Sequence, residues 1–363
     1  MAVIEQDLLA ALASIKDPHT GKDYVSTRAL RNLQIQGGDV AFDVEMGYPA
    51  KTLHPQLRSQ LVAAAKTVAG VENVSVSIST KVISHAVQRG VPLLPGVKNI
   101  IAVASGKGGV GKSTTTANLA LALAAEGARV GILDADIYGP SQTMMMGVGG
   151  KPDSTDGKTM EPKTNHGVQV MSIGLLVDQD QAMIWRGPMA VQALEQMLRQ
   201  TNWKDLDYLL IDLPPGTGDI QLTLSQRVPL TGAVIVTTPQ DIALLDARKG
   251  IKMFEKVGVP LLGLVENMAM HVCTNCGHVE HIFGADGGKK MAEEYQLDYL
   301  GSLPLSLQIR EQADSGMPTV AAAPDSEVAG IYRQVARTVA VKVAQQAKDF
   351  SAKFPSITVS SNT

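Results

Sequence analysis

A glycine-rich stretch at residues 106–113 carries the clearest chemistry in the chain. Its sequence, Gly-Lys-Gly-Gly-Val-Gly-Lys-Ser, has the GxxxxGK[ST] spacing of a phosphate-binding loop. The apolar run 100–104 precedes it and the helix-like stretch 114–125 follows it, which is the strand–loop–helix context that such a loop requires. Glycines let backbone N–H groups turn toward phosphate oxygens, and a helix N-terminus adds partial positive charge. The sequence therefore predicts a nucleotide-binding site here.

Each residue of this loop has an expected task. Lys112 is expected to reach the β- and γ-phosphates and to be needed for catalysis, and the Ser113 hydroxyl is expected to bind Mg²⁺. The remaining contacts to the nucleotide are expected from Gly106, Lys107, Gly108, Gly109, Val110, Gly111 and Thr114.

Acidic residues end two further apolar runs. Asp134 closes the run 130–134 and Asp136 follows two residues later, and Asp212 closes the run 208–212. Ligands of parallel α/β sheets gather at the carboxyl ends of strands, so we expect these acids near the loop, although Asp134 or Asp136 could instead cap a helix. Asp212 is expected to hold Mg²⁺ through water. Gly216, in the segment that follows, is expected to offer its N–H to the γ-phosphate.

The two cysteines of the chain, Cys273 and Cys276, form a CxxC pair. Such pairs occur in zinc, iron–sulfur and redox sites. A zinc site within one chain would need His278 and His281, at a spacing tighter than usual. Two cysteines are otherwise half of a four-thiolate site, which a twofold dimer would complete. On ligand number alone, a [4Fe–4S] cluster and an interface zinc ion both stay open.

Because of its second lysine, Lys107, the loop resembles the deviant Walker A motif of the MinD, ArsA and nitrogenase iron-protein group. That resemblance implies an ATP-sandwich homodimer in which Lys107 reaches the nucleotide of the partner. It also implies that Asp136 orients or activates the attacking water and that Asp134 contacts Mg²⁺ indirectly. The asparagine at the Asn267 position contacts adenine in this group, and no NKxD motif for guanine is present.

Longer stretches resemble the Mrp/ApbC (Nbp35-like) cluster-carrier ATPases. They are Glu-Asn-Met at 266–268 before the CxxC-Gly segment, and the segments 282–284, 301–304 and 314–318. The resemblance covers about residues 99–340, with Thr274 standing where family members often have proline. It implies an ATP-hydrolysing homodimer that holds a [4Fe–4S] cluster at its interface through Cys273 and Cys276. Such a carrier passes its cluster to apo iron–sulfur proteins and works with an upstream assembly scaffold.

The spacing of apolar residues predicts a small α+β domain at 1–82, a linker at 83–98, an ATPase domain at 99–348 and a flexible tail at 349–363. Continuous apolar strands in the ATPase domain predict a P-loop NTPase fold of class α/β, with a mostly parallel sheet covered by helices on both faces. These strands are 99–104, 130–134, 168–173, 208–212, 233–237, 262–266 and 299–303. The small domain resembles the cluster-assembly domain of Mrp/ApbC proteins. It has Tyr48 where relatives often have cysteine, so thiol chemistry is excluded there and a docking or regulatory role is expected.

Composition excludes several partners. Over 363 residues the net charge is −3 and the pI about 6.2, so no basic footprint indicates nucleic acid. No apolar run is long enough to span a bilayer, and the acidic N-terminus is unlike a signal peptide, so a cytoplasmic protein is expected. A MinD/ParA-like positioning ATPase remains an alternative, as does a zinc-bridged, nucleotide-switched dimer. The valine-rich face of helix 326–348 is expected to pack on the sheet, without stable membrane association.

Overall fold

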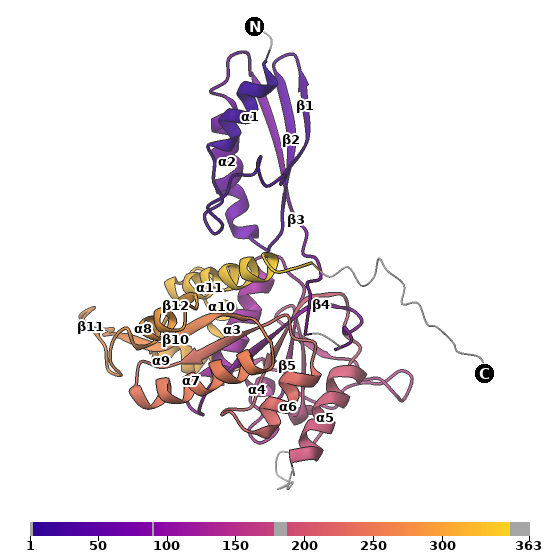
Figure 1. Cartoon of the computed structure of the whole chain (residues 1–363), viewed down its shortest axis with the longest axis vertical. Coiled ribbons are helices and arrows are strands. Elements are labelled where there is room, and N and C mark those ends of the chain that lie inside the picture. The colour runs from indigo at the N-terminus through magenta and orange to yellow at the C-terminus, as the bar shows by residue number, and fades with distance from the viewer. Residues whose placement is uncertain (1–2, 89–90, 178–186, 349–363) are drawn as a thin grey trace, which may run out of the picture.

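The computed structural model describes residues 3–88, 91–177 and 187–348, so the predicted tail lies outside the described residues. Figure 1 shows a small domain standing on a larger one, with the last helix between them. The small domain consists of α1 (Glu5–Ala13), β1 (Leu30–Gln36), β2 (Asp39–Met46), α2 (His54–Ala65) and β3 (Asn73–Thr80).

The small domain is held together by a hairpin and one crossover. The antiparallel strands β1 and β2 meet at Gly37, whose φ of +63° suits a glycine in a tight turn, and α2 crosses over to place β3 parallel to β2. Alternate residues of β2 are buried, as expected of a sheet with one covered face. The Tyr48 side chain is buried, and its hydroxyl donates to the Asp17 carboxylate at 2.7 Å, so this position serves packing.

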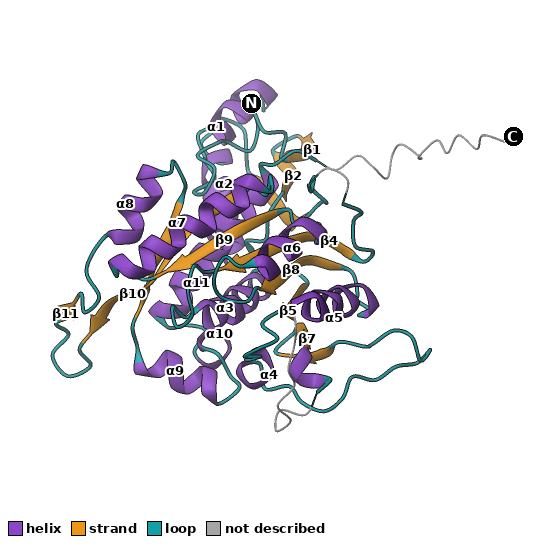
Figure 2. Cartoon of the chain, turned by 60° about the horizontal axis from the view of Figure 1, so that its bottom comes forward, coloured by secondary structure: helices purple, strands orange, loops and turns teal. Residues whose placement is uncertain are grey.

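The large domain is a nine-stranded sheet with helices on both faces (Figure 2). Its spatial order is β12-β10-β9-β4-β8-β5-β7-β6, with β11 paired to the far end of β10. The strands are β4 (Val97–Ala104), β5 (Val130–Asp134), β6 (Lys163–Asn165), β7 (Val168–Ser172), β8 (Leu206–Asp212), β9 (Gly232–Thr237), β10 (Leu261–Val272), β11 (Val279–Glu280) and β12 (Tyr299–Pro304). The helices are α3 (Lys112–Ala125), α4 (Gln142–Met145), α5 (Gly187–Gln200), α6 (Asp219–Arg227), α7 (Asp241–Lys256), α8 (Gly287–Glu294), α9 (Leu307–Asp314), α10 (Thr319–Ala322) and α11 (Glu327–Ala344).

The two faces of this sheet carry two hydrophobic clusters. Ile101 and Val103 of β4 pack with α3 and α11, whereas Ile100 and Ala102 of the same strand pack with α5 and α7 on the opposite face. Both sides of a central strand are therefore buried, which explains its continuous apolar sequence. The predicted fold is confirmed: a mostly parallel α/β sheet of P-loop NTPase type, preceded by a small α+β domain. In the large sheet, as far as the described residues show, only the short strands β6 and β11 pair antiparallel to their neighbours.

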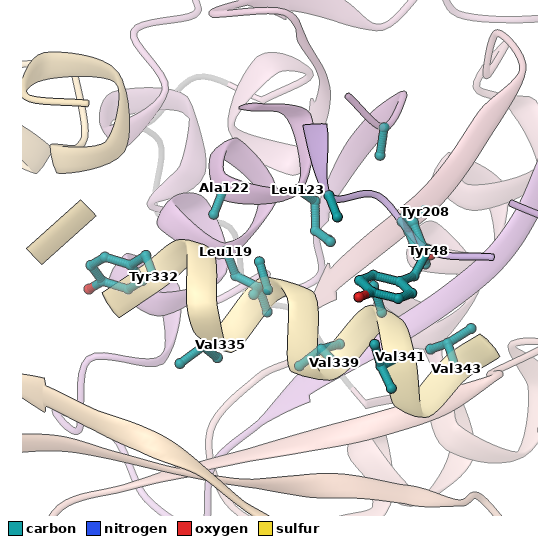
Figure 3. Close-up of a cluster of buried hydrophobic side chains, with 14 of the residues drawn as sticks. Tyr48, Leu119, Ala122, Leu123, Tyr208, Tyr332, Val335, Val339, Val341 and Val343 are labelled. Carbon is teal, nitrogen blue, oxygen red and sulfur yellow. The ribbon is translucent and has the colours of Figure 1, made fainter. Parts of the chain in front are cut away.

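Helix α11 buries its valine face, as expected. Val335, Val339 and Val343 are fully buried, and Figure 3 shows them in one cluster with Leu119 and Leu123 of α3. A face that is already covered by α3 and β12 cannot also lie on a membrane surface. None of the helices in the described ranges is long and apolar enough to cross a membrane.

The segment predicted as a linker is bonded to the large domain near its start. The His85 ring lies 2.9 Å from the side-chain oxygen of Asn99, and the Ala86 N–H donates to Ala347 at 2.9 Å. Strand β4 begins at Val97, two residues before the expected start. The domain boundaries themselves stay predictions.

A buried carboxylate joins the two domains. Glu126, the residue after α3, accepts hydrogen bonds from the N–H and hydroxyl of Thr52 in the small domain, at 3.0 and 2.6 Å. It also pairs with Arg337 of α11. The Glu126 side chain is 0% and the Arg337 side chain 13% exposed, so this is a desolvated ion pair. Because the pair is buried, removal of either partner would leave the other charge unpaired and away from water.

We predict that Arg337→Ala lowers the free energy of unfolding by about 3 kcal/mol, because it leaves the Glu126 carboxylate buried without a counter-ion. Urea unfolding measures this loss. Adding Glu126→Gln to Arg337→Ala should recover part of the stability, since an amide needs no counter-ion. Equal stability of Arg337→Ala and the unchanged chain would show that the pair is well hydrated.

Candidate functional site

The predicted phosphate-binding loop lies at the centre of the sheet edge. Residues 106–111 connect β4 to α3, and Lys112, Ser113 and Thr114 form the first turn of that helix. Two glycines are required by close contacts. A Cβ at Gly106 would lie 2.1 Å from the backbone of Asp246 in α7, and one at Gly111 would lie 2.1 Å from the Asn267 amide. The loop therefore packs closely against both α7 and β10.

Lys112 and Asp212 form a buried ion pair at this edge. β8 lies beside β4, so the Asp212 carboxylate comes next to the start of α3, and the Lys112 ammonium donates to its Oδ1. The two side chains are 6% and 0% exposed. The Thr116 hydroxyl donates to the same oxygen at 3.3 Å. Two residues that the sequence assigned to phosphate and Mg²⁺ are thus brought into direct contact.

Asp134 ends the neighbouring strand β5 and is also fully buried. Its carboxylate accepts hydrogen bonds from the backbone of Ser141 and Gln142 and from the Ser172 hydroxyl, each at 3.0 Å. Burial, and secondly the charge of Asp212, raise the pKa of Asp134 to about 7. These hydrogen bonds stabilise the Asp134 carboxylate, whose ionisation is costly because it is buried and lies close to the charge of Asp212.

Gln142 is not among the residues predicted from the sequence. This buried side chain donates to Asp212 Oδ2 at 2.9 Å and to the Ser113 carbonyl at 3.0 Å, and so links the loop to β8. Its own oxygen, Oε1, has no hydrogen-bond partner among the described protein atoms. No motif marks this glutamine, and only its position on α4 directly after the acidic strand end could have drawn attention to it.

The arrangement suits a bound Mg²⁺ ion. The charge of Asp212 acts on both Asp134 and Asp136, and the Lys112 ammonium acts on Asp136, so acidic groups outnumber basic ones here. The oxygen groups available are the Ser113 hydroxyl, the carboxylates and the unpartnered Gln142 oxygen, and Mg²⁺ prefers oxygen ligands together with retained waters. The residues present therefore fit this cation.

Asp136 and Gly216 lie beside this group in different ways. Burial raises the pKa of Asp136, and the Gly139 N–H donates to its carboxylate at 3.3 Å. The Gly216 N–H donates to the Ser105 carbonyl at 3.1 Å. The predicted contact of this N–H with a γ-phosphate stays a prediction, and it would require the bond to Ser105 to break.

The structure gives Asn267 and Lys107 different surroundings. The Asn267 amide donates to the Val110 carbonyl at 2.8 Å and is buried, so in this structure it supports the loop. Its predicted contact with adenine stays a prediction. Lys107 is half-buried, with its carbonyl bonded to the Ser105 hydroxyl at 2.9 Å, and its side chain makes no ion pair within the described residues.

The cysteine pair lies at the tip of the β10–β11 hairpin, which projects from the edge of the molecule (Figures 1 and 2). The Cys273 N–H donates to His278 and the Gly277 N–H to Cys273, both at 2.9 Å. Both thiols are free, and Cys276 is exposed. Backbone N–H groups of Cys276 and Asn275 lower the pKa of the Cys273 thiol, which favours the thiolate that binds metals.

The structure does not assemble a zinc site within one chain. His281 Nδ1 lies 2.8 Å from the Ala269 carbonyl, and His278 lies beside Glu280. Across residues 3–88, 91–177 and 187–348, no three His, Cys, Asp or Glu side chains are grouped so that they could hold a metal ion. Apolar side chains flank the pair instead: Val272, Val279 and Ile282 are 46%, 48% and 54% exposed.

Sequence comparisons match both domains. A family described as NUBPL iron-transfer P-loop NTPase matches residues 96–340, and one described as iron-sulfur cluster assembly protein matches residues 5–78. A relative from Pseudomonas fragi, named iron-sulfur cluster carrier protein, is 60% identical over 280 residues, which are 77% of this chain and 98% of the relative. A relative of the same name from Escherichia coli K12 is 51% identical over 333 residues, 92% of this chain and 90% of the relative.

Solved structures resemble the large domain. The nucleotide-binding protein of Archaeoglobus fulgidus, solved in complex with ADP, is 39% identical with a TM-score of 0.54, over 61% of this chain and 87% of that protein. The cell division ATPase MinD of Pyrococcus furiosus is 25% identical with a TM-score of 0.50, over 66% and 98% of the two chains. Both likenesses agree with a P-loop nucleotide-binding fold.

We predict that Lys112→Ala lowers the free energy of unfolding by about 3 kcal/mol, because it leaves the Asp212 carboxylate buried and unpaired. Chemical denaturation without nucleotide or Mg²⁺ measures the effect. The double variant Lys112→Ala with Asp212→Asn should regain much of this stability while still failing to bind nucleotide tightly. A single variant as stable as the unchanged chain would mean that Asp212 is accessible to water.

Proposed function

The chain belongs to the NUBPL iron-transfer P-loop NTPase family, and from this premise we propose that it is an ATP-hydrolysing iron–sulfur cluster carrier. In this proposal a homodimer holds one [4Fe–4S] cluster as cargo between its two cysteine pairs and transfers it to apo-proteins. An upstream assembly scaffold supplies the cluster. The observation that carries the proposal is the pair of free, adjacent thiols at an exposed hairpin tip, on a chain that also has a complete phosphate-binding loop.

The loop region supports binding and hydrolysis of MgATP. Lys112 is the group that neutralises the β- and γ-phosphates, and Ser113 and Asp212 are the groups that hold Mg²⁺, Asp212 through water. When bound, Mg²⁺ neutralises charge on the phosphates. Asp136 is the proposed group that orients the attacking water, since its carboxylate interacts with the charges of Lys112 and Asp212 and is only half-buried. Asn267 is proposed to bias the site toward adenine.

The number of ligands supports cluster binding between two copies of the chain. One hairpin offers Cys273 and Cys276, whereas a [4Fe–4S] cluster takes four thiolates. A twofold axis beside the hairpin tip would bring two such pairs together. The exposed apolar residues Val272, Val279 and Ile282 on the same hairpin would then be covered by the partner. Lys107, which has no ion-pair partner within the described residues, would reach the nucleotide of the other copy.

A zinc ion bridging two hairpins is the competing occupant, because four thiolates also suit zinc. This second candidate keeps the nucleotide-switched dimer and removes the cargo. The relatives named iron-sulfur cluster carrier protein favour the cluster. Metal analysis separates the two candidates.

We predict that anaerobic reconstitution yields about four irons and four sulfides per dimer. Cys276→Ala should lose this iron and the associated visible absorption while still binding nucleotide, since the loop is built from other elements. Thr274→Ala, on the same hairpin but without a thiol, is the matched control and should load normally. Zinc in place of iron, or full iron loading by Cys276→Ala, would contradict the proposed cluster site.

Hydrolysis needs its own test. Asp136→Asn should reduce ATP turnover by at least about 100-fold, the usual contribution of a group that handles the proton or orientation of the nucleophile. ATP binding by the variant should remain near that of the unchanged chain. Equal turnover by the variant and the unchanged chain would remove Asp136 from its proposed role.

A further inference from the structure

Gln142 touches three groups of the nucleotide site at once. It begins α4, and its side chain is fully buried. Its Nε2 donates to the Asp212 carboxylate at 2.9 Å and to the Ser113 carbonyl at 3.0 Å. Its backbone N–H donates to the Asp134 carboxylate at 3.0 Å. Gln142 thus bonds the residues of the predicted Mg²⁺ site through its side chain and the acid behind them, Asp134, through its backbone.

The orientation of the Gln142 amide is determined by its contacts. Both acceptors of Nε2 are oxygen atoms, so exchanging the amide nitrogen and oxygen would place Oε1 against two oxygens. In the observed orientation Oε1 is buried and has no partner among the described protein atoms. An acceptor in this position is costly unless a donor reaches it. The O–H groups of Mg²⁺-bound water are donors of the required kind, because Mg²⁺ keeps several of its waters.

The bond from Gln142 to Asp212 matters because Lys112 forms an ion pair with the same carboxylate. The ammonium of Lys112 donates to Asp212 Oδ1, and this bond weakens when the ammonium shares its three N–H donors with nucleotide phosphates. When Lys112 turns to phosphate, the buried Asp212 carboxylate retains two side-chain donors. They are Gln142, at 2.9 Å on Oδ2, and Thr116, at 3.3 Å on Oδ1.

We propose that Gln142 is a positioning residue that keeps Asp212 directed at the Mg²⁺–nucleotide complex after Lys112 has turned to the phosphates. The proposal rests on the proposed function for the identity of the ligand, MgATP or MgADP. Holding Oδ2 leaves Oδ1 for a Mg²⁺-bound water. The Gln142 bond to the Ser113 carbonyl fixes the distance between the two groups that face the ion.

A residue with this role affects the binding of Mg²⁺ and not the binding of phosphate by the loop at residues 106–111. Residues 106–111 would contact phosphate through their backbone, and they receive no bond from the Gln142 side chain within the described structure. Loss of Gln142 should therefore leave the Mg²⁺-free affinity for nucleotide nearly unchanged. It should weaken the part of the affinity that Mg²⁺ adds. A purely structural glutamine would change both affinities together.

The test uses Gln142→Met in the full chain, because methionine has a similar length but neither donates nor accepts strongly at this position. Binding of fluorescent ADP and of a non-hydrolysable ATP analogue is measured in EDTA and over a range of Mg²⁺ concentrations, together with the melting temperature. We expect the Mg²⁺ concentration for half-maximal tightening to rise about tenfold, which corresponds to about 1.4 kcal/mol. Thr143→Val, the next buried residue of α4, is the matched control and should behave like the unchanged chain.

An unchanged Mg²⁺ dependence in Gln142→Met, or an equal loss of affinity in EDTA and in Mg²⁺, would overturn the proposal. If this variant does not fold, Gln142→Asn takes its place, because it keeps both polar groups one methylene shorter. Hydrolysis is not among the measurements. A chain that binds MgADP but never turns over ATP would therefore contradict the proposed ATPase and leave the result on Gln142 intact.

Discussion

The buried pair of Lys112 and Asp212 is the constraint around which the large domain is built. Two desolvated charges are stable only when each has its partner and further hydrogen bonds. The adjacent strands β4 and β8 supply the partners by placing the loop beside the acidic strand end. Thr116 and Gln142 supply the further bonds. The same groups that make this interior stable without ligand are those that a MgATP complex would rearrange.

Strand β10 connects the two candidate sites of the molecule. Asn267 within this strand donates to the loop carbonyl of Val110, and Cys273 follows the end of the same strand. Between them the backbone turns at Met268, whose φ of +56° is unusual for a residue with a side chain. The loop and the cysteine hairpin are therefore joined by one continuous strand.

The sequence predicts the central architecture well because the signals are local. Seven apolar runs become strands, and the expected helix after the loop begins at Lys112. Other features depend on contacts between distant residues. β6 and β11 are short and polar, so only pairing with a neighbour makes them strands. The extension of β10 to Val272 depends on β11 in the same way. The bonds of Gln142 and of the Gly216 N–H follow from packing and leave no pattern in the sequence.

The joint at Glu126 has a consequence for the evolution of the chain. Within the buried polar joint, Glu126 and Arg337 belong to the large domain, and the small domain contributes Thr52 and His19, which bond to these two side chains. If an ancestor lacked the small domain, these two side chains would have formed an ordinary surface pair, worth about 0–1 kcal/mol. Gene fusion could then bury an existing pair without first creating an unpaired charge. Loss of the small domain would simply return both groups to water, so the module can be gained or shed without an unstable intermediate at this joint.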